Sequence, residues 1–326
     1  MLIRIGTLAV LSLLDPSRGP VSGTVSASSR VITATFEHPA GSRRYRLVLP
    51  DSGSVKQRAL VVVLHGCAQG AEDIARLTRM DEKGAEQGFA VLYPEQAPAA
   101  NPLRCWNWFT PAHQHRDVGE PAILAGMIRR MVSEYGLDST RIHLIGLSAG
   151  AAMANVLAVS YPELIAGLGL HSPVAYRSAE SVSRALGVMR GDLVSPDSGA
   201  HAAAEEMGAR RRAIPVLIMH GGSDNVVAPV NGLATAEQWR RVNQGANVRE
   251  PTAARDENSP RHAAITRYTG VAPVEYWHIE GMAHAWSGGP AGDRFADSTG
   301  PDATAIFLRF FAEHAALRGM SIRKER

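Results

Sequence analysis

The segment from Ile142 to Met153 places the strongest constraint on how this chain can fold. It is an apolar run that ends in Gly146–Leu147–Ser148–Ala149–Gly150 and is followed at once by small, helix-forming residues. A Gly-x-Ser-x-Gly motif between a strand and a helix is typical of a nucleophile elbow, a sharp turn that presents the serine hydroxyl. Glycines are needed in such a turn because neighbouring backbones approach too closely for a Cβ. Alone, the motif is equally consistent with a Gly-rich turn that carries a solvated serine.

Strand-like and helix-like segments alternate along most of the chain. Apolar runs predict buried strands at 59–64, 89–93, 141–145, 165–170 and 214–220. Further strands are expected at 31–36, 44–49, 265–268 and 274–279, and helices at 72–87, 121–135, 149–160, 234–242 and 303–316. This alternation predicts an α/β fold with a mainly parallel central sheet and helices on both faces.

The predicted organisation is an N-terminal arm at 1–30, one catalytic domain at 31–318 and a basic tail at 319–326. The arm contains a short apolar run that is consistent with either a signal peptide, with Ala27 as a candidate cleavage point, or a loosely packed segment. Residues 172–212 interrupt the strand–helix rhythm and are expected to form either a cap over the site or an ordinary crossover. Residues 246–262 are polar, and no element is expected there.

Composition excludes several classes of protein. Of the 326 residues, 45% are hydrophobic and 20% are charged, as in an ordinary water-soluble domain. The net charge of +3 comes without a dense basic stripe, so we expect no nucleic-acid partner. The apolar run at 5–14 is too short to span a bilayer. The two cysteines either pair in an oxidising compartment or remain thiols in the cytosol. The signal-like N-terminal segment favours an extracellular or periplasmic location, with a cytoplasmic one as the alternative, and no oligomeric state is predicted.

A candidate acid and a candidate base follow the elbow in the order that a serine hydrolase requires. Asp224 lies just after the predicted strand 214–220, and His284 lies a few residues after the strand 274–279. Functional groups collect at such strand ends in open α/β sheets. Taken singly, Asp224 is also consistent with a turn residue and His284 with an ordinary loop histidine. Order and placement together predict a Ser148–His284–Asp224 catalytic triad.

The loop after the strand 59–64 is the candidate oxyanion element. Its sequence is His65–Gly66–Cys67, and the glycine allows the backbone to bend so that the Cys67 N–H faces the elbow. With the N–H of Ala149 at the start of the following helix, it would provide two donors for a tetrahedral oxyanion.

At this point the chain resembles esterases of the poly(3-hydroxybutyrate) depolymerase type, a family with an α/β-hydrolase fold that includes feruloyl esterases. The resemblance covers about residues 43–315. It rests on the elbow and on further blocks in one order, namely Leu64–His65–Gly66–Cys67 with Gln69, Tyr93–Pro94–Glu95–Gln96, Cys105–Trp106–Asn107–Trp108–Phe109, Arg116–Asp117, Gly119–Glu120–Pro121, Gly281 with His284–Ala285–Trp286–Ser287–Gly288–Gly289, and Gly300–Pro301–Asp302–Ala303. One departure is Ala151, where the family often has a second glycine.

The resemblance implies that Ser148 is the nucleophile, Asp224 the acid and His284 the base. Cys67 and Cys105 stand at the family's paired cysteine positions, which implies a disulfide between the oxyanion loop and the tryptophan-rich loop. Six residues near the expected site are candidate substrate contacts: His65, Gln69, Trp106, Trp108, His171 and Trp286. Each tryptophan is equally consistent with core packing, and His171 with an ordinary strand-end position.

The sequence His113–Gln114–His115–Arg116–Asp117 has spacing found in some metal sites, but it lacks further ligands. We therefore expect no metal and no cofactor. Asp117 and Glu120 are instead expected to cap the helix that follows.

The predicted function is that of a serine esterase acting through an acyl-enzyme on short-chain esters or 3-hydroxyalkanoate oligomers. No segment recognisable as a polymer-binding domain follows residue 318, so small or oligomeric esters are expected rather than solid polymer. A feruloyl or acetylxylan-type carbohydrate esterase is the alternative within the same chemistry. A non-catalytic ligand-binding homologue is the alternative of another class, and a lyase or cofactor-free peroxidase is compatible with the fold.

Overall fold

The computed structural model describes residues 29–50, 58–192, 195–244 and 250–315. The predicted N-terminal arm, with its candidate signal segment, lies almost wholly outside these residues, and so does the predicted basic tail at 319–326. Among the described residues, no helix is both long enough and apolar enough to cross a bilayer.

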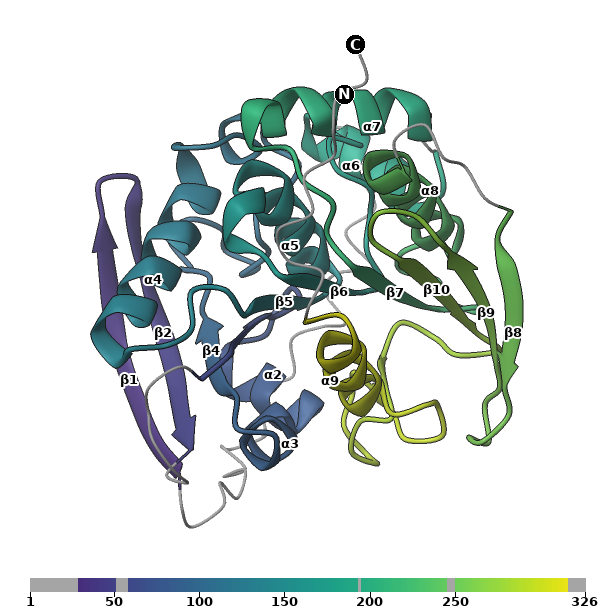
Figure 1. Cartoon of the computed structure of the whole chain (residues 1–326), viewed down its shortest axis with the longest axis horizontal. Coiled ribbons are helices and arrows are strands. Elements are labelled where there is room, and N and C mark those ends of the chain that lie inside the picture. Colours follow the sequence, from purple (N-terminus) through teal and green to yellow (C-terminus); the bar gives the residue numbers. More distant parts are fainter. Residues whose placement is uncertain (1–28, 51–57, 193–194, 245–249, 316–326) are drawn as a thin grey trace, which may run out of the picture.

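A ten-stranded sheet runs through the described chain (Figure 1). Its spatial order is β1-β2-β4-β3-β5-β6-β7-β10-β9-β8. The strands are β1 (Ser29–His38), β2 (Gly41–Pro50), β3 (Leu60–Leu64), β4 (Ala90–Pro94), β5 (Ile142–Leu147), β6 (Gly167–His171), β7 (Val216–Gly221), β8 (Thr252–Asp256), β9 (Ala263–Tyr268) and β10 (Val274–Ile279). A separate two-residue pair joins β11 (Trp286–Ser287) to β12 (Ala296–Asp297).

The six central strands, from β4 to β10 in spatial order, all run parallel. The strands β3, β4, β5, β6 and β7 are buried along their whole length, as their continuous apolar runs predict. Because parallel strands end at the same edge of a sheet, the loops that follow β3, β5, β6, β7 and β10 converge there.

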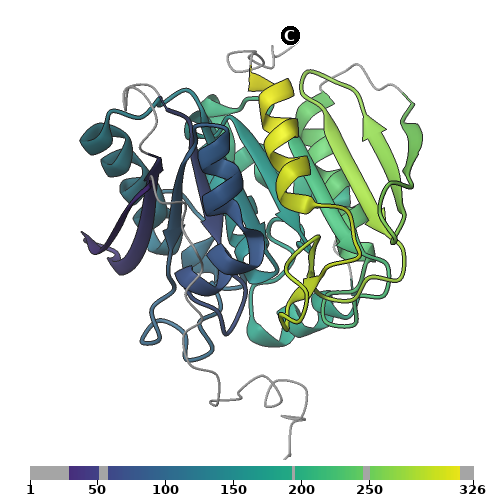
Figure 2. The ribbon, with the colours of Figure 1, turned by 90° about the horizontal axis from the view of Figure 1, so that it is seen from below.

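Helices cover both faces of the sheet. The helices are α2 (Ala71–Thr78), α3 (Met80–Glu86), α4 (Gly119–Tyr135), α5 (Ala149–Ser160), α6 (Val182–Met189), α7 (Pro196–Met207), α8 (Val230–Gln244) and α9 (Ala303–Glu313), with short 3-10 turns η1 (Pro111–His113), η2 (Pro162–Leu164) and η3 (Gly208–Arg210). Helices α4 to α8 lie on one face, and α2, α3 and α9 lie on the other (Figure 1). Figure 2, seen from below, shows the yellow α9 lying across the second face. The predicted fold class, an α/β-hydrolase with a mainly parallel sheet, is confirmed.

The structure differs from the predicted elements in two places. The single helix expected at 72–87 is broken into α2 and α3 at Arg79, whose φ of 51° is left-handed. The polar segment 246–262, where no element was expected, contains the edge strand β8, whose residues are mostly exposed. An exposed edge strand has no apolar run, and so it carries no hydrophobic pattern that would reveal it.

The connection 172–212 contains α6 and α7. Helix α7 packs against α5 and α8 on one face of the sheet, which is the position of a crossover helix between the parallel strands β6 and β7.

Candidate active site

Ser148 occupies a strained turn between β5 and α5. Its φ of 56° and ψ of −121° lie outside the regions that L-residues favour, at a typical cost of about 1–3 kcal/mol. The turn is held by a hydrogen bond from Ser148 N to His171 O (2.9 Å) and one from Ala152 N to Ser148 O (2.9 Å). Such strain lifts a side chain away from both the strand and the helix, and Ser148 remains partly exposed in a region that is otherwise buried.

The two glycines of the motif are required by the close approach of backbones. A Cβ on Gly146 would lie 2.3 Å from Gly150 O, and a Cβ on Gly150 would lie 2.1 Å from Leu64 O. These contacts are with main-chain atoms, which do not move aside easily. Any residue larger than glycine would therefore push α5 away from the sheet or from the loop after β3.

Asp224 and His284 are hydrogen-bonded to each other. Asp224 follows β7 and His284 follows β10, and His284 Nδ1 lies 2.7 Å from Asp224 Oδ2. The other carboxylate oxygen accepts the N–H groups of Val226 (2.9 Å) and Val227 (2.8 Å). The Asp224 side chain is fully buried, whereas that of His284 is 12% exposed. With Nδ1 occupied, Nε2 is the ring nitrogen of His284 that remains for a serine hydroxyl.

The elbow and the His284 loop are both attached to the end of β6. The backbone of His171 accepts Ser148 N, and the ring of His171 accepts Ser287 N at Nε2 (3.3 Å). Burial is the main cause that lowers the pKa of the His171 ring; the neighbouring His220 and His284 lower it further, and Asp224 opposes them. The three predicted triad residues are therefore anchored at the same edge of the sheet.

A second histidine contacts Asp224, and the sequence analysis did not identify it. His220, the fifth residue of β7, is fully buried, and its Nε2 lies 3.4 Å from Asp224 Oδ2 and 2.8 Å from Val227 O. Burial raises the pKa of the Asp224 carboxyl, but hydrogen bonds from His220 and His284 outweigh burial and hold that pKa well below its usual range. The available signal was a histidine four residues before the acid, at the end of an apolar run.

The loop after β3 lies against the elbow. A Cβ on Gly66 would lie 3.6 Å from the Cβ of Ser148, so the backbone that leads into Cys67 passes beside the serine. Within the described part of the chain, neither Cys67 N nor Ala149 N has a hydrogen-bond acceptor. Free N–H groups at a loop and at a helix N-terminus are the donors that an oxyanion needs.

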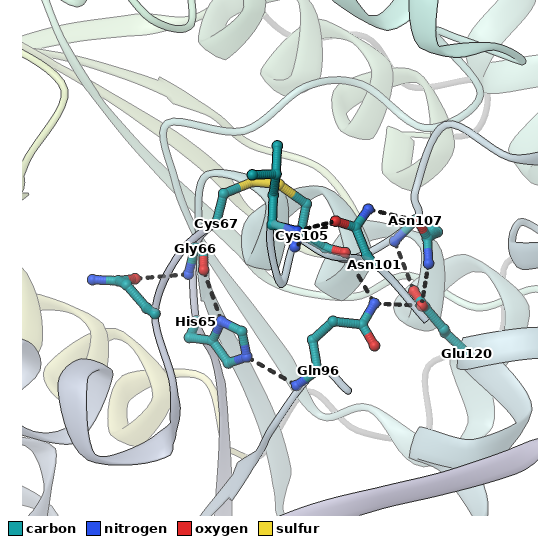
Figure 3. Close-up of a disulfide and its surroundings, with 10 residues drawn as sticks. His65, Gly66, Cys67, Gln96, Asn101, Cys105, Asn107 and Glu120 are labelled. Atoms are coloured by element: carbon teal, nitrogen blue, oxygen red, sulfur yellow. Dashed lines mark hydrogen bonds between the residues drawn. A yellow bond between two sulfur atoms is a disulfide. The ribbon is translucent and has the colours of Figure 1, made fainter. Parts of the chain in front are cut away.

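Cys67 and Cys105 form a disulfide in the structure (Figure 3). It ties the loop after β3 to the loop that carries the tryptophans, and it closes a separation of 38 residues. Disulfides of this kind typically contribute about 2–4 kcal/mol to stability. Ala68 N also donates to Leu103 O (2.8 Å), so the two loops are joined by both a covalent bond and a hydrogen bond.

Several predicted substrate contacts are buried and form hydrogen bonds within the protein. Gln69 is 4% exposed, and its Oε1 accepts Gly66 N (2.8 Å). His65 is fully buried, with Nδ1 bonded to Gly66 O (2.7 Å) and Nε2 accepting Gln96 N (3.0 Å). His171 is likewise fully buried, and both of its ring nitrogens have partners. We therefore withdraw His65 and His171 as substrate contacts, because neither has a free nitrogen to offer.

The three candidate tryptophans are also buried and do not form an exposed pocket wall. Trp286 is 1% exposed, packs against Phe307 and donates its indole N–H to Thr304 Oγ1 (3.2 Å). Trp106 has no exposed surface and lies 5.5 Å from the ring of His65. Trp108 is 7% exposed and contacts Phe109 edge-on. These side chains belong to the core under the site, and buried and cleft-lining aromatics cannot be distinguished by residue type alone.

The buried histidines make stability depend on pH. Burial lowers the pKa of His65 to about 4 and the pKa of His171 to about 3, against about 6.5 in an unfolded chain. Between about pH 6.5 and 4 the unfolded chain therefore binds protons that the folded protein cannot. The free energy of unfolding should fall by about 1.4 kcal/mol per pH unit for each histidine as the pH drops through this window.

Urea unfolding at about pH 7 and about pH 5 tests this expectation. Asp224, whose pKa is lowered, adds to acid lability only below the unfolded carboxyl range near pH 4. A His65→Gln variant should lose part of the pH dependence, whereas the same change at the exposed His201 should not. Equal unfolding free energies at the two pH values would contradict the assignment of neutral buried rings.

The His-x-His-x-Asp segment does not form a cluster. His113 Nδ1 accepts Glu120 N (3.0 Å), whereas His115 Nδ1 lies 2.7 Å from Glu206 Oε2. Among the described residues, no group of three or more potential ligands could hold a metal ion. The helix cap expected from Asp117 and Glu120 was wrong, because α4 begins after Val118 without a side-chain cap. Glu120 is instead fully buried among other partners.

Comparison with known proteins identifies the family. The family model described as Esterase PHB depolymerase matches residues 43–262. The chain belongs to this family. It is 32% identical over 235 residues to poly(3-hydroxyalkanoate) depolymerase C of Paucimonas lemoignei, covering 72% of this chain and 56% of the relative. The chain thus spans little more than half the length of that relative.

A further relative and a solved structure are also similar to this chain. Feruloyl esterase B of Neurospora crassa is 30% identical over 66% of this chain and 75% of its own length. The solved structure of an acetyl xylan esterase from Aspergillus awamori superposes with a TM-score of 0.66 at 22% identity, covering 79% of this chain and 94% of that one. The superposition shows that the fold is shared, whereas the sequence matches show to which family the chain belongs.

Proposed function

We propose that this protein is a cofactor-independent serine esterase that forms an acyl-enzyme. Ser148 attacks the ester carbonyl while His284 accepts its proton, and Asp224 orients and stabilises the resulting imidazolium. The N–H groups of Cys67 and Ala149 bind the oxyanion. His284 then protonates the departing alcohol, and water repeats the cycle on the acyl-enzyme. The observation that carries this proposal is the 2.7 Å hydrogen bond between His284 and Asp224 at the sheet edge that bears the strained Ser148.

The proposed substrates are small or oligomeric esters, in particular short-chain esters and 3-hydroxyalkanoate oligomers. The family match and the poly(3-hydroxyalkanoate) depolymerase relative support this choice. Feruloyl or acetylxylan-type carbohydrate esters are the second candidate, supported by relatives named feruloyl esterase B and acetylxylan esterase A. An extracellular or periplasmic location is proposed because the Cys67–Cys105 disulfide requires an oxidising compartment.

A substrate panel tests both parts of the proposal. We expect the highest kcat/KM on p-nitrophenyl butyrate and on 3-hydroxybutyrate trimers, compared with methyl ferulate and acetylated xylan. A preference for methyl ferulate or acetylated xylan would replace the hydroxyalkanoate assignment with a carbohydrate esterase. If none of these esters were hydrolysed, the protein would be a ligand-binding homologue and the catalytic proposal would be wrong.

A further inference from the structure

The second residue of α4, Glu120, is a buried carboxylate with an unusual set of partners. Its side chain has no exposed surface and accepts hydrogen bonds from Gln96 and Asn107, as Figure 3 shows, and a further one from Arg43. Removing a carboxylate from water costs several kcal/mol unless partners compensate fully. Arg43 Nη2, at 3.2 Å, supplies the balancing positive charge and is itself buried. The remaining hydrogen bonds all come from the loops that hold Cys67.

One set of hydrogen bonds runs from Glu120 through Gln96 to the residue before Cys67. The Gln96 amide group donates to Glu120 Oε1 and to Cys105 O (2.9 Å). The backbone N–H of Gln96 donates to His65 Nε2 (3.0 Å), which leaves the proton of that neutral ring on Nδ1. His65 Nδ1 then donates to Gly66 O (2.7 Å). The carbonyl of Gly66 belongs to the same peptide unit as Cys67 N, so this bond fixes the plane of that peptide.

A second set runs through Asn107 to the disulfide. Glu120 Oε2 accepts Asn107 N (2.8 Å), and Oε1 accepts Asn107 Nδ2 (2.7 Å). Asn107 Oδ1 in turn accepts Asn101 Nδ2 (3.0 Å). Asn101 Oδ1 accepts the N–H groups of Leu103 (3.0 Å) and Cys105 (3.4 Å). Cys105 is bonded to Cys67, so this set holds the other side of the same residue.

We propose that Glu120 is a positioning residue that aims the Cys67 N–H at the substrate oxyanion. The inference rests on the proposed esterase function. Glu120 touches no substrate and acts through Gln96 and Asn107. Both sets of hydrogen bonds start at one carboxylate; the first ends on Gly66 O, and the second ends on Cys105, which the disulfide joins to Cys67. The N–H of Cys67 has no acceptor within the described residues. An oxyanion donor must be fixed before the reaction, because reorientation during the reaction would cost part of its effect.

Glu120→Gln tests this role with little change of volume. The amide replaces one acceptor oxygen with a donor that faces other donors, so at least one set of hydrogen bonds must break. We expect kcat to fall about 10- to 100-fold, somewhat less than the loss of a whole oxyanion donor. KM and the pH at which kcat/KM declines should stay near the wild-type values, because the His284–Asp224 pair is untouched. Inhibition by a trifluoromethyl ketone, which forms a tetrahedral oxyanion, should weaken in parallel with kcat/KM.

Asp81→Asn is the matched control. Asp81 is also a carboxylate paired with an arginine, although it is half-buried, and it accepts two hydrogen bonds from Arg46 and one from Tyr93; it lies in α3 on the other face of the sheet. We expect Asp81→Asn to lower stability but to leave kcat and ketone inhibition unchanged. If Asp81→Asn and Glu120→Gln reduced kcat equally, the effect of Glu120 would be one of general stability and the proposal would be wrong.

If Glu120→Gln does not fold, the milder variant Asn101→Ala tests the same role. Asn101→Ala removes only the surface end of the second set, at a partly exposed residue. It should lower kcat and ketone affinity in the same direction by about 3- to 10-fold, a fraction of a donor's typical effect. A wild-type kcat in every folded variant that lacks these hydrogen bonds would overturn the role of Glu120 alone. Inactivity of the wild-type protein itself would instead refute the esterase proposal.

Discussion

Replacing Ser148 by alanine should reduce turnover of p-nitrophenyl butyrate by about five to six orders of magnitude, as loss of the nucleophile does in other serine hydrolases. The reason is geometric as well as chemical. The strained backbone of the elbow places this hydroxyl alone at the turn, with the helix N-terminus behind it. No water can take its place with the same alignment, so only the residual contribution of the oxyanion donors would remain.

Ser172→Ala is the matched control for this variant. Ser172 also follows a central strand and also has a left-handed φ, of 51°, but it is buried and its N–H bonds to Met219 O. We expect Ser172→Ala to retain ester hydrolysis. Because alanine keeps the Cβ and therefore the same backbone strain at position 148, the Ser148→Ala protein should fold about as stably as the wild type, which a thermal melt would check. Retained turnover in a folded Ser148→Ala protein would exclude Ser148 as the nucleophile.

Asp224→Asn should lower kcat by about four orders of magnitude at neutral pH, as in other triads whose acid becomes an amide. An amide in this place can donate to His284 Nδ1, which favours the tautomer with the proton on Nε2. That tautomer cannot accept the proton of Ser148. The buried carboxylate also accepts two backbone N–H groups and faces His220, so some loss of stability will accompany the loss of rate.

The pH dependence of the wild type follows from the same carboxylate. Because hydrogen bonds from His220 and His284 keep the pKa of Asp224 well below its usual range despite burial, Asp224 stays ionised throughout mildly acidic conditions. Loss of activity under mildly acidic conditions should therefore not come from protonation of Asp224. In the Asp224→Asn variant, the rate of ester hydrolysis should rise as the pH is increased above neutral. A variant with wild-type kcat and an unchanged pH profile would show that Asp224 is not the acid.

The elbow could be predicted from sequence because its backbone accepts only glycine at two positions. Gly146 and Gly150 stand where a Cβ would meet main-chain atoms, and α5 begins at Ala149 and ends at Ser160 as its sequence predicts. The buried parallel strands were equally visible as apolar runs. Asp224 and His284 could be predicted as the acid and the base because each follows such a strand, and because the acid must precede the histidine along the chain.

Other features could not be read in this way because they depend on long-range contacts. The break at Arg79 and the edge strand β8 carry no hydrophobic pattern of their own. Trp286, a candidate substrate contact that was equally consistent with core packing, lies in the core, because burial of an aromatic depends on which residues the fold packs against it. Glu120 was expected to cap a helix, whereas the partners of its carboxylate lie 13 to 77 residues away in the sequence.

Identification of the residue that a fluorophosphonate modifies would test the proposed chemistry most directly. We expect the native protein to react stoichiometrically, and proteolysis with mass spectrometry should locate the phosphonyl group on Ser148. Reaction should be very slow in His284→Ala, which keeps the hydroxyl but removes the base. A native protein that stays unmodified, or one modified at a different residue, would contradict the assignment of Ser148, His284 and Asp224 as the catalytic residues.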